Sequence, residues 1–288
     1  MPKYTSIMKL ESIKSEPNSS IFSTENSAIM GILNITEDSF YDGGQYLNKE
    51  QIIIRCENML DEGASIIDIG AQSSRPGATQ ISSEEELKKL LPVIKLLKNK
   101  IPKIKISVDT FWSNTAKLSI SEGADIINDI SAGEIDKNML TTIAQLNVPY
   151  IMTHMKGNPE NMQNAPHYYN ITHEIISFLR KKIDILNKLG FNKIIIDPGF
   201  GFGKTMKHNY QLLNNIEKFK IFELPILVGT SRKSMIYNLL KITPKEALNG
   251  TSITNTIALQ NGANILRVHD VKEAMECIKI TKFAKKNS

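Results

Sequence analysis

Three consecutive stretches decide the fold class of this chain: KIKISVD (103–109), FWSNTAKLSISEG (111–123) and DIINDI (125–130). The first and third are short, rich in β-branched residues and almost continuously apolar, which is typical of strands buried on both faces. The middle stretch has apolar residues at helical spacing and ends in Gly123, and glycine commonly terminates helices. This strand–helix–strand order predicts two parallel strands joined by a helix that packs over them.

The same unit recurs along the whole chain. Amphipathic stretches such as 171–190 and 243–262 also end in glycine and alternate with further apolar runs. These runs are AIMGILN (28–34), SIIDIG (65–70), PYIMTH (149–154), KIIIDP (193–198), PILVGT (225–230) and NILRVH (264–269). Eight strand–helix units favour an α/β fold of the (β/α)₈ TIM-barrel type over a doubly wound open sheet, because a closed barrel leaves no unprotected edge strand.

The length of 288 residues suits a single domain, since such barrels take about 250 residues. We expect an N-terminal extension over 1–27 that is poorly ordered in part, a barrel over 28–283 and a basic tail over 284–288. The polar N-terminus lacks the apolar core of a secretory signal, and no apolar run approaches the roughly 20 residues that span a membrane. A cytoplasmic protein without a membrane partner is the expectation.

Charge and cysteine content limit the kinds of partner and the cellular compartment that we expect. The net charge of +5 comes from lysines spread over helix-like segments, which indicates solvated faces and no nucleic-acid surface. A modest positive bias suits an anionic substrate. Cys56 and Cys277 both lie in helix-like stretches, so we expect buried free thiols in a reducing compartment.

Polar residues stand at the predicted strand ends, where barrel enzymes carry their active sites. Asp109, Asn128 and Asp197 offer carboxylate and amide groups that suit a flat heterocycle rich in N–H donors. Asp68 lies slightly deeper and is interpreted as structural, whereas His154 either lines the mouth or packs beneath it. Cationic or potentially cationic residues suit a phosphate or pyrophosphate, and these are Arg75, Lys233, Arg267 and His269. The sequence thus predicts a ligand with a nitrogen-rich ring and an anionic end.

Two glycine- or serine-containing loops follow predicted strands. DPGFGFGKT (197–205) is no P-loop, because Pro198 stands where that motif needs glycine, so we interpret it as a tight loop close to a ligand. In VGTSRKS (228–234), four residues, Ser231, Arg232, Lys233 and Ser234, form a candidate anion site at a helix N-terminus.

Seven ordered segments closely resemble the signature segments of the dihydropteroate synthase family. They are IMGILNITEDSFYDGG (29–44), GASIIDIGAQSSRPGA (63–78), ISVDT (106–110), GADIINDIS (123–131), IIIDPGFGFGKT (194–205), ILVGTSRKS (226–234) and ILRVHDV (265–271). The resemblance runs from about residue 28 to about residue 280. It implies a (β/α)₈ barrel that condenses 7,8-dihydropterin-6-ylmethyl diphosphate with 4-aminobenzoate and releases pyrophosphate.

The resemblance also implies roles for individual residues. Pterin-binding positions match Asp109, Asn128, Asp197 and Lys233. Asn34 matches a residue that helps to hold Mg²⁺ and diphosphate, Ser74 matches a diphosphate contact, and Arg267 and His269 match an anion-binding pair. The positions near the aminobenzoate match Arg75, Pro76, Phe202 and Ser234. Asn34, Asp109, Lys233 and Arg267 are therefore the expected catalytic group, Mg²⁺ the expected cofactor, and a homodimer formed through helices at the far end of the barrel the expected assembly.

The chain departs from the family pattern at Glu37, Gln72, Ser74 and Lys156. The first three replace the usual proline, glutamate and threonine of two loops, 36–44 and 70–80, that close over the reacting groups. These changes bear on loop kinetics and on the response to sulfonamides. Two other functions are compatible with such a barrel: a pterin-dependent methyl transferase, and a pterin-binding paralogue without activity. The residues retained for diphosphate, such as Lys233 and Arg267, argue against both.

Overall fold

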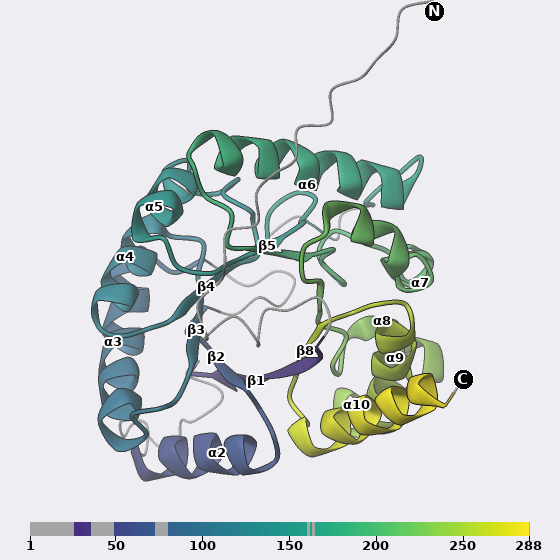
Figure 1. Ribbon diagram of the computed structural model, residues 1–288, viewed down its shortest axis with the longest axis horizontal. Helices are drawn as coiled ribbons and strands as arrows, with labels where there is room; N and C mark the ends of the chain where they lie inside the picture. The colour runs from purple at the N-terminus through teal and green to yellow at the C-terminus, as the bar shows by residue number, and fades with distance from the viewer. Residues whose placement is uncertain (1–25, 36–48, 73–79, 160–161, 163–164, 288) are drawn as a thin grey trace, which may run out of the picture.

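The computed structural model describes residues 26–35, 49–72, 80–159, 162 and 165–287. Parallel strands form a central barrel, and helices surround it (Figure 1). The strands are β1 Ala28–Asn34, β2 Ile66–Gly70, β3 Ile106–Asp109, β4 Ile126–Asp129, β5 Tyr150–Thr153, β6 Ile194–Asp197, β7 Leu227–Val228 and β8 Ile265–Val268. Each lies within one of the eight apolar runs of the sequence, so the predicted barrel is confirmed.

The helices alternate with the strands. Their bounds are α2 Lys49–Asp61, α3 Ser83–Lys100, α4 Ser113–Ser121, α5 Met139–Leu146, α6 Ile171–Lys188, α7 Met206–Leu213, α8 Ser234–Leu240, α9 Leu248–Gln260 and α10 Val271–Lys286, with 3₁₀ turns η2 Ile216–Phe222 and η3 Pro244–Glu246. Helix α10 continues to Lys286, so residues 284–286 form its last turn rather than a separate tail. In the described part of the chain, no helix is long and apolar enough to cross a membrane.

The sheet has the order β6-β5-β4-β3-β2-β1-β8-β7, with every named pair parallel. A single bridge between Ile196 and Ile226 closes the barrel between β6 and β7. Strand β7 has only two residues in the ladder. The barrel is therefore held most weakly by backbone hydrogen bonds at β7, a point that matters for the turn that follows it.

The interior of the barrel explains where the polar residues point. Side chains alternate between the two faces of a strand, so residues two apart share a face. A fully buried floor, separate from the core between strands and helices, is formed by Ala28, Met30, Ile66, Ile126, Ile151, Ile195, Leu227 and Ile265. Two positions after four of these floor residues come Asp68, Asn128, Asp197 and Arg267. Strand periodicity thus sets a polar layer directly on the apolar floor.

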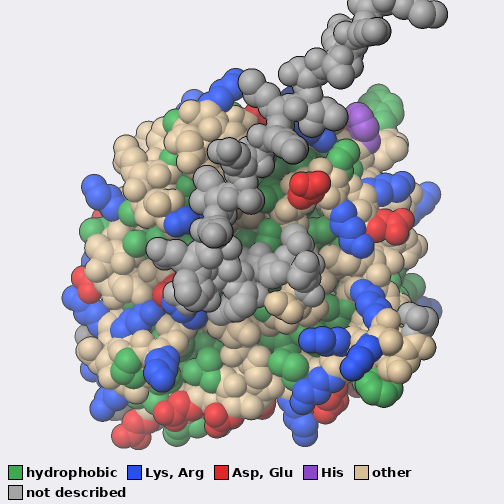
Figure 2. All heavy atoms as spheres, in the orientation of Figure 1, with side chains coloured by type: hydrophobic (Ala, Val, Ile, Leu, Met, Phe, Trp, Pro, Cys, Tyr) green, Lys and Arg blue, Asp and Glu red, His purple; other side chains and the backbone are tan. Residues whose placement is uncertain are grey.

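Charged side chains of both signs are interspersed around the face seen in Figure 2. This mixture agrees with the interpretation of the lysines as solvated surface residues. Both cysteines, Cys56 and Cys277, are buried free thiols, as expected.

Candidate active site at the C-terminal mouth of the barrel

Arg267 is the hub of the polar layer. Its Nε donates to Oδ2 of Asp68 at 2.7 Å, and its Nη2 donates to Oδ2 of Asp109 at 2.9 Å. The Asn128 amide also donates to Oδ2 of Asp68, at 3.1 Å. One guanidinium therefore links two carboxylates from the neighbouring strands β2 and β3, which are far apart in the sequence.

Asp68 has a structural role, as its depth in the sequence pattern indicated. It is fully buried, and its Oδ1 has no hydrogen-bond partner in the described structure. Because it holds both Arg267 and Asn128, it orients two of the predicted ligand-binding residues. Asp68 lies two residues after the floor residue Ile66 and therefore on the same face of β2. This spacing is the sequence signal that places Asp68 inside the barrel.

The carboxylates of the mouth are shifted toward the protonated form. Burial raises the pKa of Asp109 to about 7, although Arg267 opposes this shift. Burial also raises the pKa of Asp197, against the opposing charge of Lys233. Oδ2 of Asp109 is taken by Arg267, and Oδ1 of Asp197 accepts the Gly199 N–H at 2.7 Å. Each carboxyl keeps acceptor capacity for N–H groups of a ligand.

The loop after β6 is folded back against the end of β5. A Cβ at Gly199 would lie 1.9 Å from the carbonyl oxygen of His154, and the φ of Gly199 is +77°, so only glycine fits there. Nζ of Lys204 donates to Nδ1 and O of His154 and to O of Phe202. His154 therefore packs beneath the loop, buried against Phe178, which decides between the two positions left open by the sequence.

This loop presents its contacts to Lys233. Nζ of Lys233 donates to the carbonyl oxygen of Phe200 and lies 4.7 Å from the centre of the Phe202 ring. Burial lowers the pKa of Lys233 to about 8, although Asp197 opposes this shift. At neutral pH the amine is still mostly protonated.

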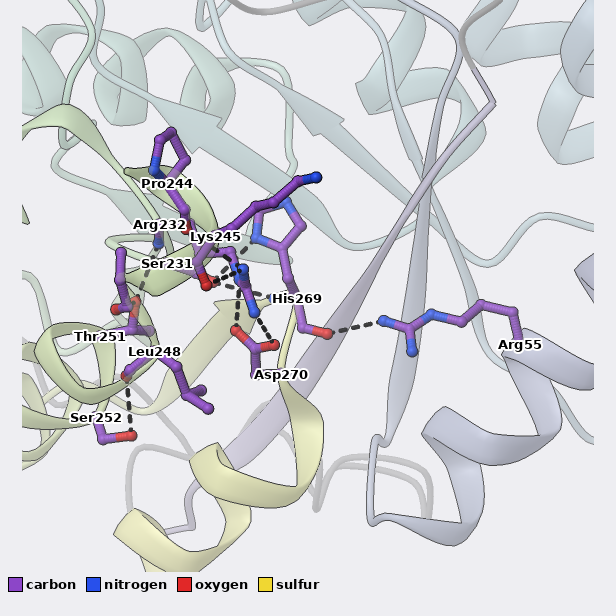
Figure 3. A network of polar contacts seen from close by, with 11 residues as sticks. Arg55, Ser231, Arg232, Pro244, Lys245, Leu248, Thr251, Ser252, His269 and Asp270 are labelled. Atoms are coloured by element: carbon purple, nitrogen blue, oxygen red, sulfur yellow. Dashed lines mark hydrogen bonds and ion pairs between the residues drawn. The ribbon is translucent and has the colours of Figure 1, made fainter. Parts of the chain in front are cut away.

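A second hydrogen-bonded group surrounds His269 at the end of β8 (Figure 3). Its Nδ1 lies 3.0 Å from Oγ of Ser231, its backbone N–H donates to the same Oγ, and its carbonyl oxygen accepts from Arg55. Burial lowers the pKa of His269 to about 4, and Arg267 adds to the shift. At neutral pH this imidazole is therefore neutral, and it serves as a hydrogen-bonding group rather than a cation.

Arg232 does not lie with the anion-binding residues that its neighbours suggested. Its Nε and Nη2 donate to the two carboxylate oxygens of Asp270, at 2.9 and 2.7 Å (Figure 3). Its Nη1 donates to the carbonyl oxygens of Pro244 and Lys245. All three guanidinium nitrogens are thus engaged within the protein.

An apolar cluster borders the polar layer. Phe111, Ile130, Met155, Met162 and Phe202 pack together, with Trp112 and Ile135 partly buried against them. Trp112 also donates from its indole nitrogen to the Ile81 carbonyl oxygen at 3.1 Å, so it is a packing residue. The mouth therefore has a polar centre and an apolar side next to Phe202.

Behind β3, a buried network supports the mouth. Oγ1 of Thr110 donates to Oε2 of Glu86 at 2.6 Å, and the Trp112 N–H donates to the same hydroxyl. Glu86 is fully buried on α3, and burial raises its pKa to about 7. Nothing in the local sequence marks Glu86 as buried, because it sits among the acidic residues of a helix start.

The structure brings together most of the predicted site. Asp109, Asn128, Asp197, Phe202, Lys233, Arg267 and His269 all lie on strand ends or on the loops that follow them. Asn34 ends β1 with an exposed side chain, and Ser234 is exposed at the first position of α8. Glu37, Ser74, Arg75 and Pro76, and most of the loops 36–44 and 70–80, lie outside the described residues.

Residues 30–269 match the model of the pterin binding enzyme family. The chain is 42% identical over 264 residues to a dihydropteroate synthase of Escherichia coli, covering 90% of this chain and 93% of that protein. A Yersinia pestis dihydropteroate synthase solved with a sulfonamide drug superimposes with a TM-score of 0.85 at 40% identity, covering 92% of this chain and 96% of that one. A Xanthomonas albilineans dihydropteroate synthase with 4-aminobenzoic acid gives a TM-score of 0.84 at 35% identity, covering 91% and 94%.

Proposed function

The chain belongs to the pterin-binding enzyme family and, within it, to the dihydropteroate synthases, which are transferases of folate biosynthesis. On this premise we propose that the mouth of the barrel joins 7,8-dihydropterin-6-ylmethyl diphosphate to 4-aminobenzoate. The observation that carries the proposal is the set of acceptors at strand ends on one rim of the barrel. Asp109 and Asn128 are register partners on β3 and β4, and Asp197 ends β6 on the same rim.

The pterin ring binds over the apolar floor. Its ring N–H and amino groups donate to the carboxyl groups of Asp109 and Asp197, and the Asn128 amide adds one donor and one acceptor. Arg267 keeps Asp109 in place and balances its charge. Lys233, between Asp197 and the Phe202 ring, donates to an acceptor on the pterin and lies closest to the second substrate.

The diphosphate binds on the side of the mouth formed by Asn34 and His269, and Ser74 is the further residue that we assign to it. Neutral His269 donates a hydrogen bond to a phosphate oxygen, and Arg267 lies close enough along β8 to stabilise negative charge as it develops. The described residues contain no group of three or more His, Cys, Asp or Glu side chains that could hold a metal by themselves. One amide ligand from Asn34 suits Mg²⁺ that arrives with the diphosphate, because Mg²⁺ keeps water and phosphate ligands. When bound, Mg²⁺ neutralises charge on the leaving diphosphate.

The reaction is a displacement at the pterin methylene carbon. The bond to the diphosphate oxygen breaks, and the aromatic amine of 4-aminobenzoate forms the new carbon–nitrogen bond and then releases a proton. The amine is unprotonated at neutral pH, so the protein does not need a strong base. Its contribution is orientation and exclusion of water by the apolar cluster around Phe111 and Phe202. Arg75, Pro76 and Ser234 are the other residues we assign to 4-aminobenzoate.

The test is an assay of pyrophosphate release with Mg²⁺. Release that requires both pterin diphosphate and 4-aminobenzoate is the expected result, with a sulfonamide competing against 4-aminobenzoate. Release without the second substrate would contradict the proposal. Pterin binding without turnover would instead identify a binding paralogue, and methyl transfer would identify the methyl transferase alternative.

We also propose a cytoplasmic homodimer. Apolar side chains are exposed on α8, α9 and α10, which lie next to one another in Figure 1; they are Leu239, Leu240, Ile253, Ile280 and Phe283. The side chains of Phe283 and Ile280 are 72% and 68% exposed, and exposure of such apolar surface to water is unfavourable in a monomer. Light scattering should give the mass of two chains, and Phe283→Glu should give the mass of one. A wild-type protein that remains monomeric at high concentration would refute the dimer.

A further inference from the structure

We propose that Arg232, through its ion pair with Asp270, is a positioning residue that sets Lys233 and His269 at the mouth. The inference rests on the proposed function for the roles of those two residues. Arg232 itself touches neither predicted substrate site. It acts by tying the turn after β7 to the start of α10 and to η3 (Figure 3).

The turn needs such a tether because the sheet supports it weakly. Strand β7 contributes only Leu227 and Val228 to the ladder, and only the bridge at Ile226 joins it to β6. The other strands have at least four residues each. Within the turn the Lys233 N–H donates to the Thr230 carbonyl oxygen, and side-chain contacts hold the turn to the elements around it.

Arg232 makes hydrogen bonds to three other segments of the chain. Its paired contacts to Asp270 are bidentate, which is the strongest arrangement for arginine and carboxylate. Its backbone N–H donates to Oγ1 of Thr251 at 3.1 Å, and its Nη1 reaches two carbonyl oxygens at 244 and 245. Four segments of the chain thus meet at this one residue.

The two neighbours of Arg232 carry the consequence. Ser231 pairs with the His269 ring and accepts from its backbone N–H, whereas Lys233 donates to the Phe200 carbonyl oxygen. Asp270 directly follows His269. The ion pair therefore joins Arg232, which lies between Ser231 and Lys233, to Asp270, which follows His269.

Backbone strain at Arg232 supports a role for its side chain. Its φ is +54°, the left-handed region that side chains other than those of Gly, Asn and Asp rarely adopt. A strained backbone conformation of this kind persists only where surrounding contacts hold it in place, and such conformations are common at functional sites. Glycine would adopt this turn without strain, whereas at Arg232 the contacts of the guanidinium stabilise the strained conformation.

The experiment compares Arg232→Met, Arg232→Lys, Arg232→Gly and Asp270→Asn with the wild type by steady-state kinetics. We expect Arg232→Met to lower kcat/KM for pterin diphosphate by about 10- to 100-fold, with a raised KM. A mere loss of folded protein would lower kcat and leave KM unchanged. Arg232→Lys, which keeps the charge, should recover part of the loss, and the double variant with Asp270→Asn should be no worse than Arg232→Met.

Arg232→Gly separates strain from tethering, because it relieves the backbone and removes the ion pair. It should fold as well as the wild type and show the same raised KM. Amides over 229–234 should exchange hydrogen faster in both Arg232→Met and Arg232→Gly, a readout that does not need activity. Arg180→Met is the matched control, since Arg180 lies on α6 over the Phe222 ring and has no contact with the site.

Wild-type kinetics in Arg232→Gly, or unchanged exchange over 229–234 in Arg232→Met, would overturn the tether. An inactive wild type would overturn the proposed function instead, and the exchange experiment would still decide the tether.

Discussion

The two halves of the mouth are built by different means. Asp68, Asp109, Asn128 and Arg267 lie on strands, where the register of the sheet and mutual hydrogen bonds hold them. Lys233 lies on a turn and depends on contacts made by its neighbours. The strand-borne group is thus part of the folded core, whereas the turn-borne group is attached to it. We therefore expect substitutions on the strands to lower both stability and activity, and substitutions on the turns to lower mainly activity.

The largest effect is expected from Arg267→Met. It leaves the Asp68 carboxylate buried without its cation, and breaking a buried pair on one side costs about 3–5 kcal/mol. Urea unfolding should show this loss, and pyrophosphate release should fall with it. Adding Asp68→Asn should recover stability but not activity. Equal stability of the wild type and Arg267→Met would show that the strand-borne residues do not contribute to stability as expected.

The pH dependence of stability tests the same region through Glu86. Burial raises its pKa in the folded protein from 4.5 to about 7, so the folded state holds the proton more tightly than the unfolded state. This contribution is fully present below about pH 4.5 and is lost as the pH rises through about 7. Glu86→Gln keeps an acceptor for Thr110 and removes the titration. Relative to the wild type, the variant should gain up to about 3 kcal/mol between pH 5 and pH 8.

Unfolding curves of both proteins at pH 5 and pH 8 make this measurement. Parallel losses of stability in the wild type and Glu86→Gln would show that Glu86 is not the responsible group. Asp109, whose pKa is also raised to about 7, would then be the next group to test.

On the turn side, Lys233→Ala should reduce kcat/KM by about 100-fold, or about 2.7 kcal/mol, because we assign its ammonium group to contacts with both substrates. Burial lowers the pKa of Lys233 to about 8, so its charge does not favour folding, and the unfolding free energy should stay within about 0.5 kcal/mol of the wild type. A large loss of stability, or near-wild-type turnover, would contradict the assignment.

The smallest effect is expected at Thr205, which caps α7 after the β6 loop. Its hydroxyl accepts the His208 N–H at 3.2 Å, and the loss of such a cap costs about 1 kcal/mol. Thr205→Ala should lower stability by that amount in a thermal or urea scan and leave KM nearly unchanged. Thr205→Ser retains the hydroxyl and is the control. A raised KM in Thr205→Ala would show that the β6 loop depends on its helix, as the β7 turn depends on its ion pair.

Sequence reasoning located the strand-borne residues better than their partners. Asp109, Asn128 and Asp197 could be predicted because each ends a short apolar run, and the ends of parallel strands meet at one rim. The sequence predicts an anion-binding role for Arg267 alongside His269, and the structure adds its ion pairs with Asp68 and Asp109. The local sequence around Arg267 shows a cation after a strand and contains no sign of carboxylates from elsewhere in the chain.

The turn after β7 shows the same limit. VGTSRKS predicted four neighbouring residues in one anion site, whereas the left-handed backbone at Arg232 separates its side chain from those of Ser231 and Lys233. Asp270 is 38 residues away in the chain, so nothing local identifies it as the partner.

The sequence alone determined the barrel and the rim on which the site lies, because strand and helix periods and strand ends are local properties of the chain. The tertiary structure decided which groups pair and which charges survive burial. Arg267 reaches its two carboxylates across 199 and 158 residues, and the pKa values of Asp109, Lys233 and His269 depend on the loss of water around them. Desolvation and long-range pairing arise only when distant strands are brought together, so they leave no pattern in neighbouring residues.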